Sequence, residues 1–136
     1  KKTGQRRDLN REKFEANQLL DRLKNFDSPA SKIISYLTHV VKVRSRFSAF
    51  HPESFMKCIS NHNDNCIIIQ RGLCENIVYV ICNMSDRFIN IQLLNIPGLL
   101  HLSSAESLVD NITGSIINPD KLRLSPYQVM WVSLTS

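Results

Sequence analysis

The sequence of 136 residues predicts an α+β chain, in which two helices are followed by an antiparallel all-β domain. Three observations indicate this fold class. Apolar residues recur with a helical period up to about residue 47. From residue 55 onward, short segments rich in β-branched and aromatic residues alternate with clusters of turn-forming residues. These segments recur about every ten residues, which is typical of an antiparallel meander or a Greek key.

The first helix is predicted from Asn10 to about Asn25. Asn10 is a suitable N-cap because its side chain can accept a backbone N–H of the first turn. Glu12 follows where the helix dipole favours a negative charge. The partial apolar stripe of this helix consists of Phe14, Leu19, Leu20 and Leu23.

The second helix is predicted from Pro29 to about Phe47. Ser28 precedes it as N-cap, and proline at the first helical position loses no hydrogen bond. Its apolar residues recur with the helical period and form a stripe of Ile33, Ile34, Leu37, Val40 and Val41. An apolar stripe on a helix usually faces a core.

The β domain is predicted to begin after the segment Ala49-Phe50-His51-Pro52. Residues 95–107 are less regular, and Pro97-Gly98 marks a turn among them. Strands are expected over residues 55–60, 65–70, 76–83, 88–94, 108–110, 115–117, 122–124 and 127–134.

Composition excludes several classes of protein. No apolar run approaches the roughly 18 residues of a membrane-spanning helix, and no signal peptide is visible. The cysteines are eight residues apart and form no Cys-x-x-Cys pair, so no metal site is expected. Cys66 and Cys82 border apolar runs, which predicts buried, reduced thiols in a cytoplasmic protein. The glycosylation sequons at residues 83–85 and 111–113 are interpreted as incidental.

The positive charge is concentrated at the start of the chain. Residues 1–46 hold 12 of the 17 basic and 5 of the 12 acidic residues, a net charge of +7, whereas the remainder carries −2. This asymmetry has two interpretations, a nucleic-acid arm or a basic helical face that meets an acidic partner surface. The second is favoured because Phe14, Phe26 and Tyr36 fall at helix-packing positions rather than among the basic residues.

No catalytic set is recognisable in the β domain. Its acidic residues fall mostly in turns, where solvated side chains are expected: Glu53, Asp64, Glu75, Asp86, Glu106, Asp110 and Asp120. His51 is expected to make a capping hydrogen bond, and His39 to pack at the rim of a helix. Trp131 and Tyr127 are expected in the core rather than in a sugar-stacking platform.

Residues 4–11 stand out from this background. Arg6, Arg7 and Arg11 crowd around Asp8 in a loop immediately before a helix. Arginine presents a planar fork of donors, so such a loop suits an anionic or polyhydroxylated ligand.

Four segments together resemble the motifs of sucrose phosphorylase and its relatives, within the alpha-amylase family of glycoside hydrolases. They are Arg7-Asp8-Leu9-Asn10-Arg11, the stretch 44–52 that ends in Ala-Phe-His-Pro, the turn Asp110-Asn111-Ile112-Thr113-Gly114, and the segment 124–131 with Pro-Tyr-Gln-Val-Met-Trp. The resemblance implies that residues 1–49 are the end of the catalytic (β/α)8 barrel, with its last strand–helix loop and final helices. Residues 50–136 would then be the C-terminal antiparallel β domain, a Greek-key sandwich.

The resemblance also implies a site. In such enzymes the first arginine of the opening motif helps to bind phosphate or sugar, a role that falls to Arg7. Asp8, Asn10 and Arg11 would support the loop and the helix start. Whether Arg6 or Arg7 faces the ligand stays open, because Arg6 adds a second charge.

The implied activity belongs to a larger protein. Such enzymes are retaining glycosyl-transferring phosphorylases, with an aspartate nucleophile, a glutamate acid/base and phosphate as acceptor. Those carboxylates lie on earlier barrel strands, so this chain alone is expected to be inactive. The expected partners are a sugar substrate, inorganic phosphate and the missing barrel, with no cofactor, nucleic acid or membrane. The alternatives are the tail of an alpha-amylase-family hydrolase or amylosucrase-like transferase, and a stand-alone carbohydrate- or nucleic-acid-binding module.

Overall fold

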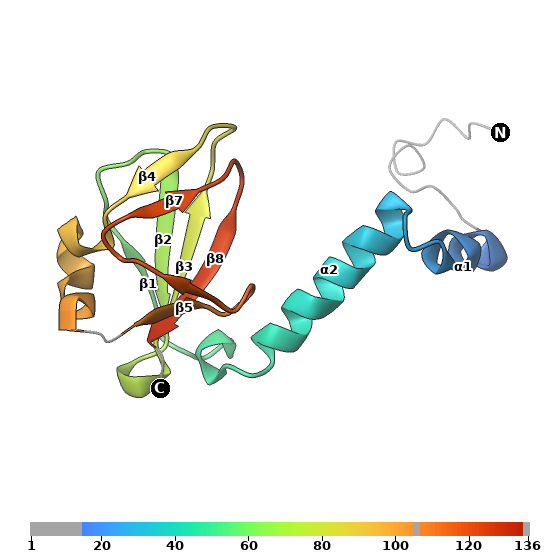
Figure 1. Ribbon diagram of the computed structural model, residues 1–136. Helices are drawn as coiled ribbons and strands as arrows, with labels where there is room; N and C mark the ends of the chain where they lie inside the picture. The colour runs from blue at the N-terminus through green and yellow to red at the C-terminus, as the bar shows by residue number, and fades with distance from the viewer. Residues whose placement is uncertain (1–14, 105–106, 135–136) are drawn as a thin grey trace, which may run out of the picture. The chain divides into compact units, whose positions relative to one another are not determined.

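The computed structural model describes residues 15–104 and 107–134, which fall into two units that divide between Val40 and Val41. The first unit contains α1 (Ala16–Lys24) and most of α2 (Pro29–Arg44). The second contains the end of α2 and the β domain (Figure 1). In the part of the chain that the structure describes, no helix is long and apolar enough to cross a membrane.

The predicted cap of α2 is confirmed. The Ser28 hydroxyl accepts the N–H of Ser31 at 3.1 Å and donates to the carbonyl of Arg22 at 2.7 Å. The helix ends at Arg44, before the predicted Phe47, because Arg46 and Phe47 already make three-residue turn hydrogen bonds. The helix α1 begins at Ala16, because Glu15 has an extended backbone, so the prediction of one helix running from Asn10 is wrong at Glu15. The predicted cap Asn10 itself lies outside the described residues.

The apolar stripe of α2 is largely exposed in the structure. Ile33, Ile34, Leu37 and Val41 are 50–63% exposed, whereas Val43, at the end of the helix, is buried. The expectation that the stripe packs into a core is therefore wrong at these four residues, and Val40, its remaining apolar member, is half-buried. Val43 is not among the predicted members.

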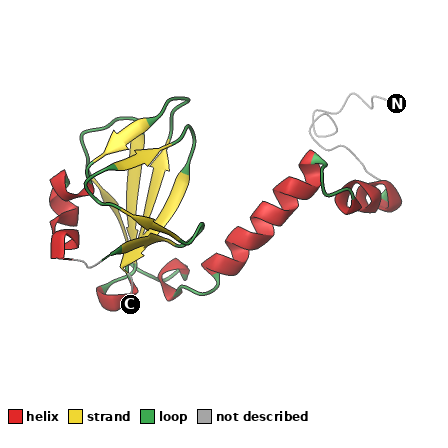
Figure 2. Ribbon diagram, viewed as in Figure 1, coloured by secondary structure: helices red, strands yellow, loops and turns green. Residues whose placement is uncertain are grey.

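The β domain contains two antiparallel sheets (Figure 2). The larger one has the strand order β1-β2-β3-β8-β5-β6, and the smaller one pairs β4 with β7. The strands are β1 (Met56–Ile59), β2 (Cys66–Arg71), β3 (Val78–Asn83), β4 (Ile89–Ile91), β5 (Leu108–Asp110), β6 (Ser115–Ile117), β7 (Leu122–Leu124) and β8 (Val129–Leu134). An antiparallel β domain is thus confirmed, and β1 to β3 form a meander, while the Greek-key sandwich stays a prediction.

The irregular stretch that the sequence predicts is built from short 3-10 turns, η3 (Leu93–Asn95) and η4 (Pro97–Ser104). Two further turns, η1 (Ser48–Phe50) and η2 (Cys74–Asn76), precede β1 and β3. Leu93, Leu99 and Leu102 from these connections are buried, so the connections close one side of the core.

One hydrophobic core joins the two sheets. Ile68 and Ile81 are directly opposite each other in β2 and β3, and both are fully buried. Leu122 and Leu124 of the small sheet belong to the same buried cluster, so β4 and β7 pack across the inner face of the large sheet (Figure 1). Alternation along the strands therefore gives the large sheet an inner and an outer face.

The segment after α2 covers part of the outer face. The rings of Phe50 and Trp131 lie 4.5 Å apart, and Phe47 meets Phe50 edge-on at 6.3 Å. Trp131 is only 9% exposed, as predicted, but Tyr127 is 68% exposed. The prediction for Tyr127 is wrong because this residue adopts a left-handed φ of 56° and precedes the strand, which begins at Val129.

Candidate functional site

The predicted substrate residue Arg7 lies outside the described residues. The same holds for its neighbour Arg6 and for the supporting residues Asp8, Asn10 and Arg11. Their proximity to a ligand therefore stays a prediction. The other three segments of the resemblance are described, and each has a definite place in the fold.

The Ala-Phe-His-Pro stretch is held by two arginines. Arg71, in β2, donates from Nε to the carbonyl of Ala49 at 3.1 Å and from Nη2 to that of His51 at 2.7 Å. Arg44 donates to the carbonyl of Phe50 at 3.0 Å. His51 accepts the N–H of Glu53 on Nδ1 at 3.3 Å, which confirms its predicted capping role. These guanidinium groups hold a turn rather than a ligand.

The turn 110–114 is anchored by a buried carboxylate. Asp110 has no exposed surface, which corrects the expectation that this acid is solvated. Its Oδ1 accepts the N–H groups of Ile112 and Trp131 at 3.1 and 3.0 Å, and its Oδ2 accepts the Thr113 hydroxyl at 2.8 Å. Asn111 donates to the carbonyl of Trp131 and to the hydroxyl of Ser133, both at 2.9 Å. The turn therefore fixes β8.

The segment before β8 is tied to the loop after β3. Asn83 is 2% exposed and donates from Nδ2 to the carbonyls of Arg87 and Ser125 at 2.7 and 2.8 Å. Because Asn83 and Asn111 each use both amide hydrogens internally, an attached glycan would break these bonds. This supports the interpretation that both sequons are incidental.

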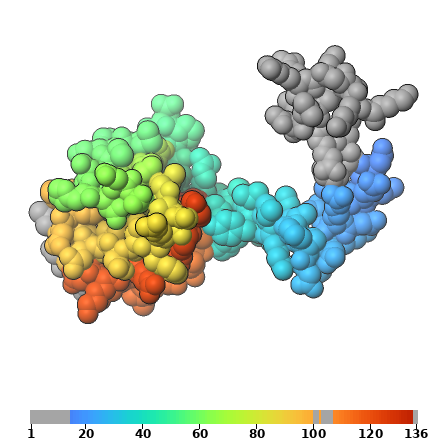
Figure 3. Space-filling model, turned by 90° about the horizontal axis from the view of Figure 1, so that it is seen from above, coloured from blue at the N-terminus to red at the C-terminus, as the bar shows by residue number. Residues whose placement is uncertain are grey.

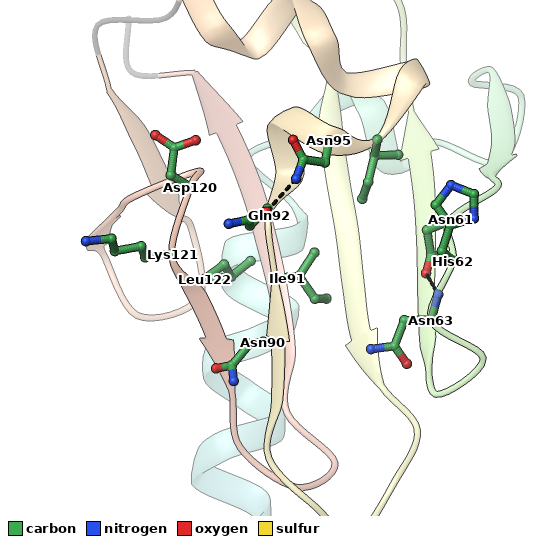
Figure 4. Close-up of a pocket in the computed structure, with 11 residues that line it drawn as sticks. Asn61, His62, Asn63, Asn90, Ile91, Gln92, Asn95, Asp120, Lys121 and Leu122 are labelled. Carbon is green, nitrogen blue, oxygen red and sulfur yellow. Dashed lines mark hydrogen bonds between the residues drawn. The ribbon is translucent and has the colours of Figure 1, made fainter.

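A polar pocket opens between the β1–β2 turn and the small sheet (Figure 4). Its volume is about 490 Å³. In Figure 4 the amides of Asn61 and Asn63 lie on one side, and Gln92 and Asn95 lie across from them. Residues 120–122 complete the lining. Figure 3 shows the green β1–β2 turn beside the yellow-to-orange segment that follows β4.

A second hollow of about 690 Å³ lies beside η1 and η2. Phe47, Ile77 and Leu134 line it together with the charged residues Arg46 and Glu75. The outer face of the large sheet is also apolar where the segment after α2 does not cover it. Its exposed members include Met56 at 64%, Ile67 at 39% and Val129 at 38%.

The cysteines are free thiols, two of them exposed. Burial and, to a smaller extent, the neighbouring Cys82 together raise the pKa of the Cys66 thiol to about 11. Burial likewise raises the pKa of Tyr79 to about 12. Among the described residues, no group of three His, Cys, Asp or Glu side chains could hold a metal ion.

Sequence reasoning missed the polar pocket. Residues 61–65 are rich in asparagine, a composition typical of a turn, and the structure has a turn there. The pocket arises because that turn meets residues 90–96 and 120–122, which lie far along the chain. The concentration of amide side chains in residues 61–65 and 90–96 is the one local signal of the pocket.

No family model matches the chain. Among curated proteins it is similar to the glucosylglycerate phosphorylase of Allomeiothermus silvanus, with 34% identity over 85 residues. That alignment covers 62% of this chain and 15% of the relative, so the chain spans about a seventh of the protein it matches.

Two solved structures share the fold. AmyP in complex with maltose matches 79% of this chain and 21% of its own, with a TM-score of 0.60 and 16% identity. A variant of AmyP in complex with maltotriose matches 79% of this chain and 22% of its own, with a TM-score of 0.61 and 15% identity. At this level of identity the likeness establishes the fold.

Proposed function

This chain resembles the C-terminal part of a sucrose phosphorylase-like enzyme of the alpha-amylase family, and we propose that it completes a retaining glycosyl-transferring phosphorylase. The observation that carries the proposal is the 34% identity with a glucosylglycerate phosphorylase over 85 residues. The activity belongs to the whole protein, whose catalytic aspartate and glutamate lie on barrel strands outside this chain. The chain alone is inactive, and the parent protein is cytoplasmic.

The β domain has a structural role in this proposal. Its buried and half-buried polar side chains make hydrogen bonds to the backbone of the β domain itself, as expected of a rigid support. Examples are Asp110, Asn83 and Arg71. The outer face of the large sheet exposes Met56 and Ile67, and exposed apolar patches of this kind mark protein interfaces. The apolar stripe of α2 is also exposed. Because α2 would be a final helix of the barrel in this proposal, the rest of the barrel would cover that stripe. The missing barrel is the proposed partner of both surfaces.

Arg7 binds phosphate or the sugar in this proposal. Active sites of (β/α)8 barrels lie on the loops that follow the strands, where residues 4–11 would fall. A guanidinium can bind phosphate with two parallel hydrogen bonds, which favours phosphate over water as the acceptor. Asp8, Asn10 and Arg11 hold the loop and begin the following helix.

The test uses the complete protein with sucrose and glucosylglycerate as donors. A phosphorylase releases sugar 1-phosphate only when inorganic phosphate is present. Arg7→Ala should raise the KM for phosphate or the donor about tenfold or more, because a charged hydrogen bond contributes about 1.5–3 kcal/mol. Arg6→Ala is the matched control. A larger effect of Arg6→Ala would transfer the role to Arg6.

A hydrolase or an amylosucrase-like transferase with the same C-terminal part is the second candidate. The structures of AmyP with maltose and maltotriose favour it, because they share the fold. Donor cleavage at an unchanged rate without phosphate would establish this candidate and overturn the phosphorylase proposal.

A further inference from the structure

Four of the amide side chains around the polar pocket are held in place by hydrogen bonds to their own turns. Asn61 donates to the carbonyl of Cys66 at 3.1 Å and accepts the N–H of Asn63 at 2.9 Å. Asn63 accepts the N–H of Asn65 at 3.0 Å, and Asn95 donates to the Oε1 of Gln92. These side chains are therefore ordered before any ligand arrives, which lowers the entropic cost of binding.

The same hydrogen bonds leave a mixed set of donors and acceptors facing the pocket. Among the described residues that line the pocket, several amide groups make no hydrogen bond within the chain and are available to a ligand. They are the amide N–H groups of Asn63 and Gln92, the amide oxygen of Asn95 and the whole amide of Asn90. A ligand that both donates and accepts at neighbouring positions matches this set. Hydroxyl groups do both, whereas inorganic phosphate is a charged group that presents mainly acceptor oxygens.

The charge and the apolar floor of the pocket further limit the class of ligand that it could bind. Asp120 and Lys121 contribute one charge of each sign, so the lining does not select an anion. Ile91, Ile96 and Leu122, which are 5–8% exposed, provide an apolar floor. His62 contributes the imidazole ring of the lining, and no Phe, Tyr or Trp is among the lining residues. The pocket therefore lacks the large aromatic platforms on which nucleobases usually stack, which disfavours a nucleobase.

We propose that this pocket is a binding site for a neutral sugar, at the level of a mono- or disaccharide, on the β domain itself. Its volume of about 490 Å³ is within the range of small-molecule sites. The amides bind the hydroxyl groups, and the floor receives the C–H face of the ring. The lining contains no Phe, Tyr or Trp ring on which the sugar could stack, so weak binding is expected. The proposal is independent of whether the parent protein is a phosphorylase.

The test is a titration of isotope-labelled 136-residue chain with maltose, sucrose and glucose, followed by amide chemical shifts. The largest shifts are expected at residues 61–63, 90–96 and 120–122. Inorganic phosphate should leave these resonances in place. Saturable shifts confined to this set support the site, and their concentration dependence gives the affinity of each sugar.

A double variant tests the contacts. Asn90→Ala with Gln92→Ala removes two exposed side chains and should weaken sugar binding about tenfold, since each hydrogen bond contributes about 0.5–1.5 kcal/mol. Asn65→Ala with Asn76→Ala is the matched control, because both asparagines are exposed and lie outside this pocket. It should leave the affinity unchanged.

Two outcomes would overturn the proposal. One is the absence of saturable shifts with all three sugars, and the other is stronger binding of phosphate than of any sugar in the pocket. Equal losses in the two double variants would also count against it. The titration of the unaltered chain decides the matter even where a variant fails to fold, and it requires no catalytic activity.

Discussion

The carboxylate of Asp110 accepts the backbone N–H of Trp131 at 3.0 Å, across 21 residues of sequence. Asp110 is the last residue of β5, and its ladder partner in β8 is Val132. The side chain therefore supplies the hydrogen bond at the point where the β5–β8 ladder stops. Trp131 in turn packs against Phe50, so one carboxylate connects the turn 110–114 to the junction before β1.

Replacing this carboxylate should destabilise the β domain. Asp110→Ala removes the buried oxygen that accepts the N–H groups of Ile112 and Trp131, which should cost about 2–4 kcal/mol in the free energy of unfolding. Urea denaturation measures this loss. Asp120→Ala, at an exposed position, is the control and should change stability by less than about 0.5 kcal/mol. Equal midpoints for the two variants would contradict the anchoring role.

Two glycines with almost the same backbone conformation should respond differently to alanine. Gly72 has φ 77° and Gly114 has φ 75°, so either substitution carries the left-handed penalty of about 1–2 kcal/mol. A Cβ at Gly72 would also overlap the carbonyl oxygen of Asn76, whereas one at Gly114 meets open space. We expect Gly72→Ala to lower the thermal midpoint clearly further than Gly114→Ala. Similar midpoints would show that the η2 turn adjusts freely.

The strand pattern was predictable wherever local alternation alone decides it. Residues 108–110, 115–117 and 122–124 are strands with the predicted bounds, because each is a short apolar alternation enclosed by turn-forming residues. Tyr127 was misplaced because the same alternation continues through it, although its backbone is left-handed. The alternation of apolar and polar residues indicates which side chains share a face of a sheet, but it does not indicate the residue at which a strand begins.

The candidate sites were less predictable for a similar reason. Asp110 resembles any turn aspartate in the sequence, and only the distant N–H of Trp131 explains its burial. The polar pocket is lined by three segments of the chain, and these segments meet only because β4 and β7 pack over the large sheet. Tertiary contacts of this kind leave no periodic signal in the chain.

Arg71 should stabilise the β domain through the geometry of its guanidinium group and not through its positive charge alone. Its guanidinium reaches the carbonyls of Ala49 and His51 together, a geometry that a lysine ammonium does not reproduce. Arg71→Ala should cost about 1–2 kcal/mol, and Arg71→Lys should recover less than half of this loss. Chemical denaturation gives both values, with Arg87→Lys as the control, because the side chain of Arg87 is 89% exposed. Full recovery by lysine would mean that charge alone matters.

Stability should fall at alkaline pH because of Cys66. Its pKa is raised from 9.0 to about 11 in the folded chain, so the unfolded chain loses this proton first. The contribution is fully present below pH 9 and is lost as the pH rises toward 11, to the extent of about 2 kcal/mol. Denaturation at a series of pH values measures it, and Cys66→Ala should flatten the dependence in this window. Burial also raises the pKa of Cys82, and it raises that of Tyr79 from 10.0 to about 12, so these two groups should account for the loss that remains. An unchanged slope in Cys66→Ala would assign the whole effect to other groups, whereas Cys58→Ala, at an exposed thiol, should leave the slope as it is.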